Sequence, residues 1–142
     1  MGRGRGPKSL STRLLIAGCL GAIVGSCSGN NDDVRAAAVA RSWLELMDAG
    51  QYGQAWTAAA PYLQRAVSAE QWSESMSRNR APLGKMQSRE IRSSKATICA
   101  LNNPCIVVEY TASFEKEPAA IETTTLIPNA DGKWKVAGYY IK

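Results

Sequence analysis

The chain has 142 residues, of which 45% are hydrophobic, and this length and composition suit a single folded domain. Its formal net charge is +5, but four of the 17 basic residues precede residue 14, and from Cys27 onward 13 basic residues balance 12 acidic ones. This balance removes the main support for nucleic-acid binding. The sequence has no histidine, which excludes Ser-His-Asp and Cys-His catalytic sites and the commonest metal ligand.

The first 26 residues follow the pattern of a secretory signal: a basic opening, an apolar run from Leu14 to Val24, and then small residues. This run is too short to span a bilayer, which takes about 20 residues. We therefore predict residues 1–26 to be an export signal rather than a transmembrane anchor.

Two cysteines in this region, Cys19 and Cys27, end the sequences "IAGC" and "VGSC". Both resemble the lipobox of bacterial lipoproteins, in which the thiol takes a diacylglyceryl group and the cysteine becomes the new N-terminus. Cleavage before Cys19 would leave only Leu14 to Gly18 after the last positive charge, fewer than the roughly 7 to 15 apolar residues that a signal needs. We therefore predict lipid attachment at Cys27, and ordinary secretion to the periplasm is the alternative.

Ser28, directly after Cys27, resembles the default case for lipoprotein transfer to the outer membrane. This resemblance implies a location on the periplasmic face of that membrane, with the lipid as the membrane contact. We expect residues 27–33 to be an extended tether that holds the domain within about 20 Å of the lipid. Residues 34–142 then form the domain.

Once Cys19 is removed with the signal and Cys27 carries the lipid, Cys99 and Cys105 are the two remaining cysteines. In an oxidising compartment these two can form one disulfide. They flank "ALNNP", a turn-forming stretch between two predicted strands. Opposite residues of such strands lie within disulfide reach. We predict a disulfide that closes this hairpin, since the spacing lacks the Cys-x-x-Cys pattern of redox sites.

Residues 32 to about 81 are rich in helix-forming residues and predict three helices. The first is capped by Asn31 or Asp32 and ends at Gly50, and the second stops before Pro61. After the connection "PYLQRAV", Ser68 and Gln71 match a capping box that starts the third helix. Pro82 and Gly84 end it.

From Lys85 onward the hydrophobic period is two, which predicts strands. The strand "CIVVEYTASFE" has one buried face, and "AAIETTTLI" and "KWKVAGYYIK" follow it on either side of the Asp131-Gly132 turn. The earlier strand "KMQSREIRSSKATIC" breaks its alternation, which indicates a bulge near Glu90. Trp134, Val136 and Tyr140 are expected to share a face.

Three helices followed by a four-stranded antiparallel meander define an α+β fold. The runs "ARSWLELMDAGQYGQAWTAAAPYLQRAVSAEQW", "RAPLGKMQSRE" and "ETTTLIPNADGKWKVAGYYIK" resemble domain of unknown function 4019, a family of bacterial exported proteins and lipoproteins, over about residues 36–142. That family has no assigned activity. The order of elements is similar to the cystatin-like and nuclear-transport-factor-2-like folds, in which helices on a curved sheet often leave a conical pocket.

Candidate catalytic groups are few. Glu109 and Glu122 are the strand carboxylates that could serve as a base, but we expect them on a solvated face of the sheet because charged residues are rarely buried unpaired. A buried carboxylate beside a tyrosine hydroxyl, in a cavity of roughly 300 Å³ or more, would favour an enzyme. No metal site and no cofactor are predicted.

Two further groups of residues are candidates for binding. Six basic residues between Arg78 and Lys95 could contact anionic headgroups, although a solvated surface is the more common role. Aromatic residues could line a ligand pocket between helices and sheet, although they more often fill a core. These candidate pocket aromatics are Trp43, Trp56, Tyr62, Trp72, Tyr110 and Tyr140, with Trp134 beside them.

Two classes of function follow from these observations. The first is a non-enzymatic envelope lipoprotein whose domain binds a partner protein or a small ligand. The second is a pocket enzyme that uses a carboxylate base on a small apolar molecule. The missing histidine and the absence of a catalytic motif favour the first class.

Overall fold

The computed structural model describes residues 28–142. The predicted export signal, its cleavage site and the lipid attachment at Cys27 lie outside the described residues and stay predictions. Within the described part, none of the helices is both long and apolar enough to cross a membrane.

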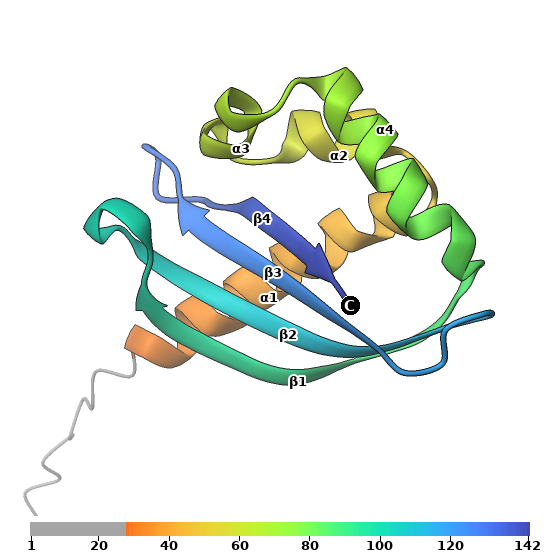
Figure 1. The fold of residues 1–142 in the computed structure, drawn as a ribbon. Helices are drawn as coiled ribbons and strands as arrows, with labels where there is room; N and C mark the ends of the chain where they lie inside the picture. The colour runs from red at the N-terminus through yellow and green to blue at the C-terminus, as the bar shows by residue number, and fades with distance from the viewer. Residues whose placement is uncertain (1–27) are drawn as a thin grey trace, which may run out of the picture.

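Along the sequence, the helices precede the strands of the single sheet, which makes an α+β fold (Figure 1). The strands pair in the order β1-β2-β3-β4, each antiparallel to the next, which confirms the predicted meander. The helices are α1 (Ser28–Asp48), α2 (Tyr52–Ala58), α3 (Pro61–Ala66) and α4 (Ala69–Arg80), followed by the short 3₁₀ turn η1 (Ala81–Leu83). The strands are β1 (Met86–Ile98), β2 (Pro104–Phe114), β3 (Ala120–Pro128) and β4 (Trp134–Ile141), with a second 3₁₀ turn, η2 (Ala100–Asn102), between β1 and β2.

Helix α1 crosses one face of the sheet, and α2, α3 and α4 lie together beyond α1 at the β4 side (Figure 1). The main core lies between these helices and the sheet. Its buried residues are Ala36, Ala40, Trp43, Leu44, Met47, Ala55, Ala59, Leu63, Trp72, Met76, Ile106, Val108, Tyr110, Leu126 and Val136. The described helices leave the opposite face of the sheet uncovered.

Two helix predictions are wrong. Helix α1 begins at Ser28, so the predicted start near Asp32 is too late and the segment expected to be an extended tether is helical from Ser28. Helix α3 was expected to be a connection. Pro61 occupies its first turn, where the fixed φ of proline favours a helix, and buried Leu63 ties the helix to the core.

The predicted helix boundary at Ser68 is confirmed. Its hydroxyl accepts a hydrogen bond from the backbone N–H of Gln71 at 3.2 Å, and the Gln71 side chain accepts one from the backbone N–H of Ser68 at 3.1 Å. Gly84 ends the α4–η1 segment with φ of 78°, a left-handed conformation that favours glycine. These local signals fix where the chain enters and leaves α4.

The alternation predicted for β2 is confirmed: Ile106, Val108, Tyr110, Ala112 and Phe114 all point into the core face. The bulge predicted near Glu90 is confirmed, because β1 shifts register at Arg92, and a second shift lies at Gln87. Each shift inserts one residue of β1 opposite its partner strand.

A register shift in β4 changes which tyrosine faces the core. Thr125 pairs with Gly138 and Leu126 pairs with Val136, which leaves Ala137 as an extra residue. Tyr139 therefore faces inward and Tyr140 faces outward, with 60% of Tyr140 exposed. The prediction that Tyr140 shares a face with Trp134 and Val136 is wrong for this reason.

Cys99 and Cys105 form the predicted disulfide, with their α-carbons 5.8 Å apart. It joins the end of β1 to the start of β2 across η2. A loop this short contributes about 2 kcal/mol by the chain-entropy model. The bond therefore clasps the hairpin at the end of the sheet.

Candidate functional site

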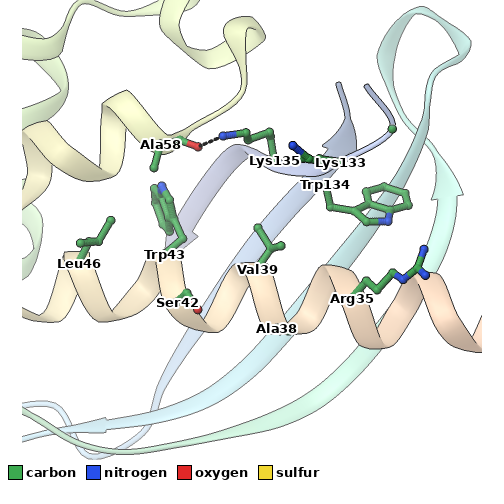
Figure 2. A pocket seen from close by; sticks show the side chains of 11 residues that line it. Arg35, Ala38, Val39, Ser42, Trp43, Leu46, Ala58, Lys133, Trp134 and Lys135 are labelled. Atoms are coloured by element: carbon green, nitrogen blue, oxygen red, sulfur yellow. Dashed lines mark hydrogen bonds between the residues drawn. The ribbon is translucent and has the colours of Figure 1, made fainter. Parts of the chain in front are cut away.

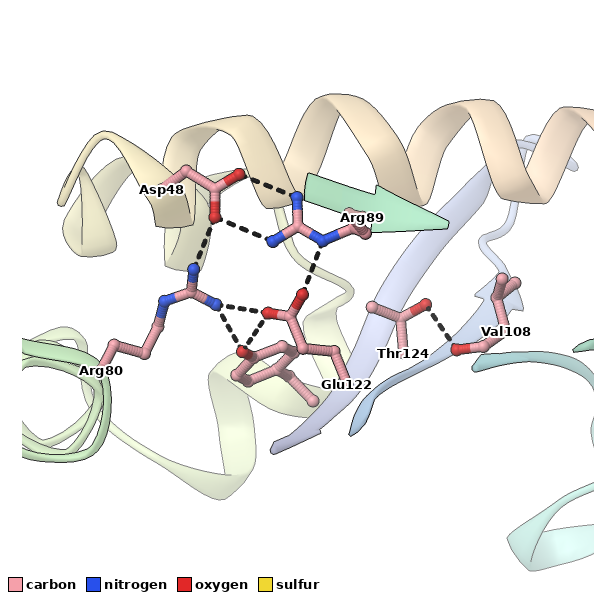
Figure 3. A network of polar contacts seen from close by, with 7 residues as sticks. Asp48, Arg80, Arg89, Val108, Glu122 and Thr124 are labelled. Atoms are coloured by element: carbon pink, nitrogen blue, oxygen red, sulfur yellow. Dashed lines mark hydrogen bonds and ion pairs between the residues drawn. The ribbon is translucent and has the colours of Figure 1, made fainter. Parts of the chain in front are cut away.

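Five side chains form a polar network between the helices and the sheet: Asp48, Arg80, Arg89, Glu122 and Tyr139 (Figure 3). Asp48 ends α1 and Arg80 ends α4, while the other three come from β1, β3 and β4. The network thus joins the C-terminal ends of two helices to three strands.

Glu122 lies at the centre of this network and has no exposed surface. One carboxylate oxygen accepts hydrogen bonds from Arg80 Nη1 at 2.7 Å and from the Tyr139 hydroxyl at 2.6 Å. The other oxygen accepts from Arg89 Nε at 2.5 Å. The expectation that Glu122 lies on a solvated face is wrong, because two guanidinium groups compensate its burial.

Asp48 bridges the same two arginines from the helix side. One of its oxygens accepts from Arg80 Nη2 at 2.5 Å and from Arg89 Nη2 at 2.8 Å, and the other accepts from Arg89 Nη1 at 2.8 Å. The Arg80 guanidinium also donates to the Tyr139 hydroxyl and lies 5.3 Å from the Phe114 ring centroid. Two positive and two negative charges therefore balance within one cluster.

The protonation states in the network follow from burial and charge. Burial lowers the pKa of Arg80, but Tyr139, Glu122 and Asp48 raise it by more, so the net pKa is raised. Arg89 shows the same balance, because its bonds to Asp48 and Glu122 outweigh burial and raise its pKa. Burial and the neighbouring Glu122 raise the pKa of the Tyr139 hydroxyl above its ordinary value of 10.0. Both arginines stay charged and Tyr139 stays protonated at neutral pH.

These contacts limit what Glu122 can do chemically. A general base needs a free lone pair within reach of a substrate proton. Both oxygens of Glu122 already accept bonds from the network, and the cavity of about 340 Å³ that Tyr139 lines is not lined by Glu122. The carboxylate stands beside a tyrosine hydroxyl, but no cavity among the described residues opens onto it.

Glu109 lies on the other face of the sheet, as predicted, and accepts a hydrogen bond from Ser93 Oγ at 3.2 Å.

Among the described residues, no cluster of three His, Cys, Asp or Glu side chains is arranged to hold a metal ion.

A groove of about 680 Å³ lies between α1 and the start of β4 (Figure 2), and we call it the α1–β4 groove. One wall is α1, Ala58 at the end of α2 lies beside Trp43, and the β3–β4 turn with the start of β4 forms the opposite wall (Figure 2). Its lining residues are Arg35, Ala38, Val39, Ser42, Trp43, Leu46, Ala58, Gly132, Lys133, Trp134 and Lys135.

The lining of the α1–β4 groove is mostly apolar, and its charged members are all cations. Trp43 and Leu46 lie at one end, Val39 in the middle, and Arg35 and Trp134 together at the other end (Figure 2). The Trp43 indole N–H donates to the Ala55 carbonyl at 2.7 Å, which fixes the ring in place.

A second groove, of about 760 Å³, lies between α1 and β1. Its lining is more polar and includes Arg41, Glu45, Arg89 and Glu90. Tyr110 also lines it, and its buried hydroxyl has no hydrogen-bond partner among the described residues. Burial raises the pKa of this hydroxyl. Opposite charges lie on this groove, in contrast to the α1–β4 groove.

The predicted pocket aromatics do not gather in one site. Trp43 lines the α1–β4 groove, Tyr110 lines the second groove, and Trp72 is buried in the core. Trp56 packs against the core and donates to the Val67 carbonyl at 2.9 Å. Tyr62 is 48% exposed and, like Tyr140, lies outside both grooves.

The structure brings in two residues that the sequence did not single out for a site, Asp48 and Tyr139. Trp43 packs against Tyr139 with ring centroids 5.6 Å apart, and against Trp72 at 5.9 Å. Trp43 is therefore the link between the polar network and the groove.

The six basic residues between Arg78 and Lys95 also separate. Arg80 and Arg89 enter the polar network, so a solvated role is wrong for these two. Arg78 pairs with Glu74 on the exposed side of α4, at 2.6 Å. The remaining members, Lys85, Arg92 and Lys95, are exposed.

The fold and these two features define a small α+β domain with a neutral buried ion cluster and an apolar groove beside it. Residues 39–139 match the family described as "Protein of unknown function (DUF4019)", and the chain belongs to this family. A 2.5 Å structure of a protein from Catenulispora acidiphila is similar, with a TM-score of 0.55 and 10% identity, over 81% of this chain and 93% of that chain. This likeness shows the fold alone. No curated protein is significantly similar in sequence.

Replacing Glu122 by alanine tests how far the fold depends on the network. Arg80 and Arg89 would keep only Asp48 as a carboxylate partner, and breaking a buried pair typically costs about 3–5 kcal/mol. We expect the free energy of unfolding in urea to fall by that amount. Glu109→Ala, on the other face of the same sheet, should cost less than about 1 kcal/mol. Equal losses would contradict a special role for Glu122.

Replacing Tyr139 by phenylalanine tests the raised pKa of its hydroxyl. The unfolded tyrosine ionises near pH 10 while the folded one keeps its proton, so the native protein should lose stability as pH rises above 10. The loss is at most about 1.4 kcal/mol per pH unit from this group. Between pH 9 and 11, the free energy of unfolding in urea should fall less steeply with pH for Tyr139→Phe than for the native protein. The exposed Tyr62→Phe variant should keep the native profile, and parallel profiles for all three proteins would refute the assignment.

Proposed function

We propose that the chain is a non-catalytic binding protein of the bacterial envelope, anchored by lipid at Cys27 to the periplasmic face of the outer membrane. Its domain binds a partner protein or a small ligand, and the α1–β4 groove is the binding site. No cofactor takes part in this function.

The carrying observation is the contrast between the groove and the polar network. The α1–β4 groove has a volume of about 680 Å³, within the range of small-molecule sites, and an apolar lining with a few polar groups. The carboxylate best placed by burial for catalysis, Glu122, is held by two guanidinium groups and a hydroxyl. This contrast supports binding and counts against the alternative, an enzyme with a carboxylate base.

The location rests on three features of the chain. The N-terminal pattern resembles an export signal that ends in a lipobox at Cys27. The Cys99–Cys105 disulfide fits an oxidising compartment such as the periplasm. Ser28, directly after Cys27, resembles the residue that follows the lipidated cysteine in lipoproteins transferred to the outer membrane. Secretion without a lipid is the alternative.

The anchoring is tested by replacing each cysteine of the N-terminal region. We expect Cys27→Ser to leave the membrane fraction and to lose the mass of the lipid. The matched variant Cys19→Ser should remain acylated and membrane-bound, because Cys19 lies within the discarded signal. An unmodified N-terminus in the native protein would reject the lipid anchor.

The groove is tested with Nile red, a neutral apolar dye, titrated into the full chain carrying Cys27→Ser so that no attached lipid competes. We expect saturable binding at one site, read from dye fluorescence. Trp134→Ala should weaken binding about 5-fold or more, because loss of a buried aromatic contact costs at least about 1 kcal/mol. Tyr140→Ala, on the outer face of the same strand, should not.

Two results would contradict the groove as the binding site. One is the absence of saturable binding by the Cys27→Ser chain. The other is an equal loss in Trp134→Ala and Tyr140→Ala, since only Trp134 lines the groove. A thermal melt of each variant establishes that it remains folded.

A further inference from the structure

We propose that the α1–β4 groove binds a single-chain amphiphile with an anionic head group, of the long-chain carboxylate type. The chain lies along Val39, Trp43 and Leu46, and the head group lies at Arg35 and Lys133. This inference rests on the proposed function and names the class of ligand for that same groove.

The apolar part of the ligand follows from the wall that α1 provides. Val39, Trp43 and Leu46 follow one another at helical spacing along the same side of α1, and all three face the groove. From Arg35 to Leu46 the helix rises by about 16 Å, at 1.5 Å per residue. A bilayer core of about 30 Å is two acyl chains thick, so one extended chain reaches about 15 Å. The groove thus has the length of a single chain.

The anionic part follows from the charge of the lining. Arg35, Lys133 and Lys135 line the groove, and no carboxylate does. The described chain as a whole is almost balanced, so this local excess of cations is a property of the groove and not of the protein surface at large. A cationic amphiphile would meet three like charges there.

The present partners of these cations leave room for an anion. Arg35 lies 4.0 Å from Asp32, and Lys133 lies 3.2 Å from Asp131, with all four side chains more than half exposed. Exposed pairs of this kind contribute little and exchange readily. Lys135 donates instead to the Ala58 carbonyl at 3.4 Å, beside the apolar end. Arg35 and Lys133 are therefore the two cations open to a head group.

The geometry also favours a small amphiphile over a peptide. The apolar residues Trp43, Leu46 and Ala58 lie at one end of the groove and the cation Arg35 lies at the other, a division that matches one apolar chain with one charged head group (Figure 2). An acidic amphipathic peptide is the competing occupant and becomes one outcome of the test.

The test compares three probes with the same twelve-carbon chain: dodecanoate, dodecyltrimethylammonium and neutral dodecyl maltoside. Each is titrated below its micelle concentration into the full chain carrying Cys27→Ser, with isothermal calorimetry and tryptophan fluorescence as readouts. Gain of two ion pairs by the anion and repulsion of the cation should give dodecanoate about a 10-fold tighter Kd than dodecyltrimethylammonium. This preference should shrink as salt is raised.

Charge variants identify the head-group site. Arg35→Gln together with Lys133→Gln should remove most of the preference for dodecanoate and leave dodecyl maltoside unchanged. The matched pair Lys95→Gln and Lys116→Gln makes the same change in net charge away from the groove and should keep the preference. An equal effect of both pairs would overturn the assignment of Arg35 and Lys133.

The remaining outcomes separate this inference from the proposed function. Equal Kd values for the three probes, all weakened by Trp134→Ala, would leave the groove as a binding site and overturn the anionic head group. No binding of any probe, together with no Nile red binding, would overturn both. An acidic amphipathic peptide that displaces dodecanoate and binds at least 10-fold more tightly would replace the small ligand with a protein partner.

Discussion

A buried carboxylate in a sheet is stable only when positively charged groups pair with it. In this domain two helices and a neighbouring strand supply the groups that form these pairs. Glu122 on β3 takes Arg80 from the end of α4 and Arg89 from β1, and Asp48 at the end of α1 closes the cluster. Both α1 and α4 are therefore tied to the sheet at their C-terminal ends. The two grooves flank α1 between Arg35 and Leu46, ahead of the network residue Asp48.

The two ends of α1 consequently have different chemistry. At Asp48 the charges are matched and enclosed, which makes that end rigid and neutral. At Arg35 the side chains are exposed and the cations outnumber the carboxylates of the lining. Trp43 lies between them, because it packs against Tyr139 of the network and also lines the α1–β4 groove. A ligand against Trp43 would therefore rest on a ring that the network holds in place.

Local signals predicted most of the fold and little of the site. The capping box at Ser68, the alternation of β2 and the cysteine spacing act over a few residues, and the structure confirms all three. In the polar network, Glu122 binds Arg89 and Arg80, which precede it in the sequence by 33 and 42 positions. Nothing in the sequence around Arg80 or Arg89 distinguishes either one from a solvated basic residue. One signal indicated that Glu122 faces inward: it lies an even number of positions from Ala120 and Leu126, so all three share one face of β3. Tyr139 was missed because one extra residue in β4, Ala137, exchanges the two faces of the strand.

The early start of α1 changes the mechanical connection between the domain and a membrane. An extended tether over residues 27–33 would let the domain turn freely over the surface, with the groove facing any direction. A helix that already begins at Ser28 instead acts as a stiff stem, along which Arg35 lies only about 10 Å from the first helical residue. With a lipid on the preceding cysteine, such a stem would hold the cationic end of the α1–β4 groove close to the bilayer and its apolar end, at Trp43 and Leu46, farther away. An amphiphile leaving the membrane surface would then meet an opening that already points toward it.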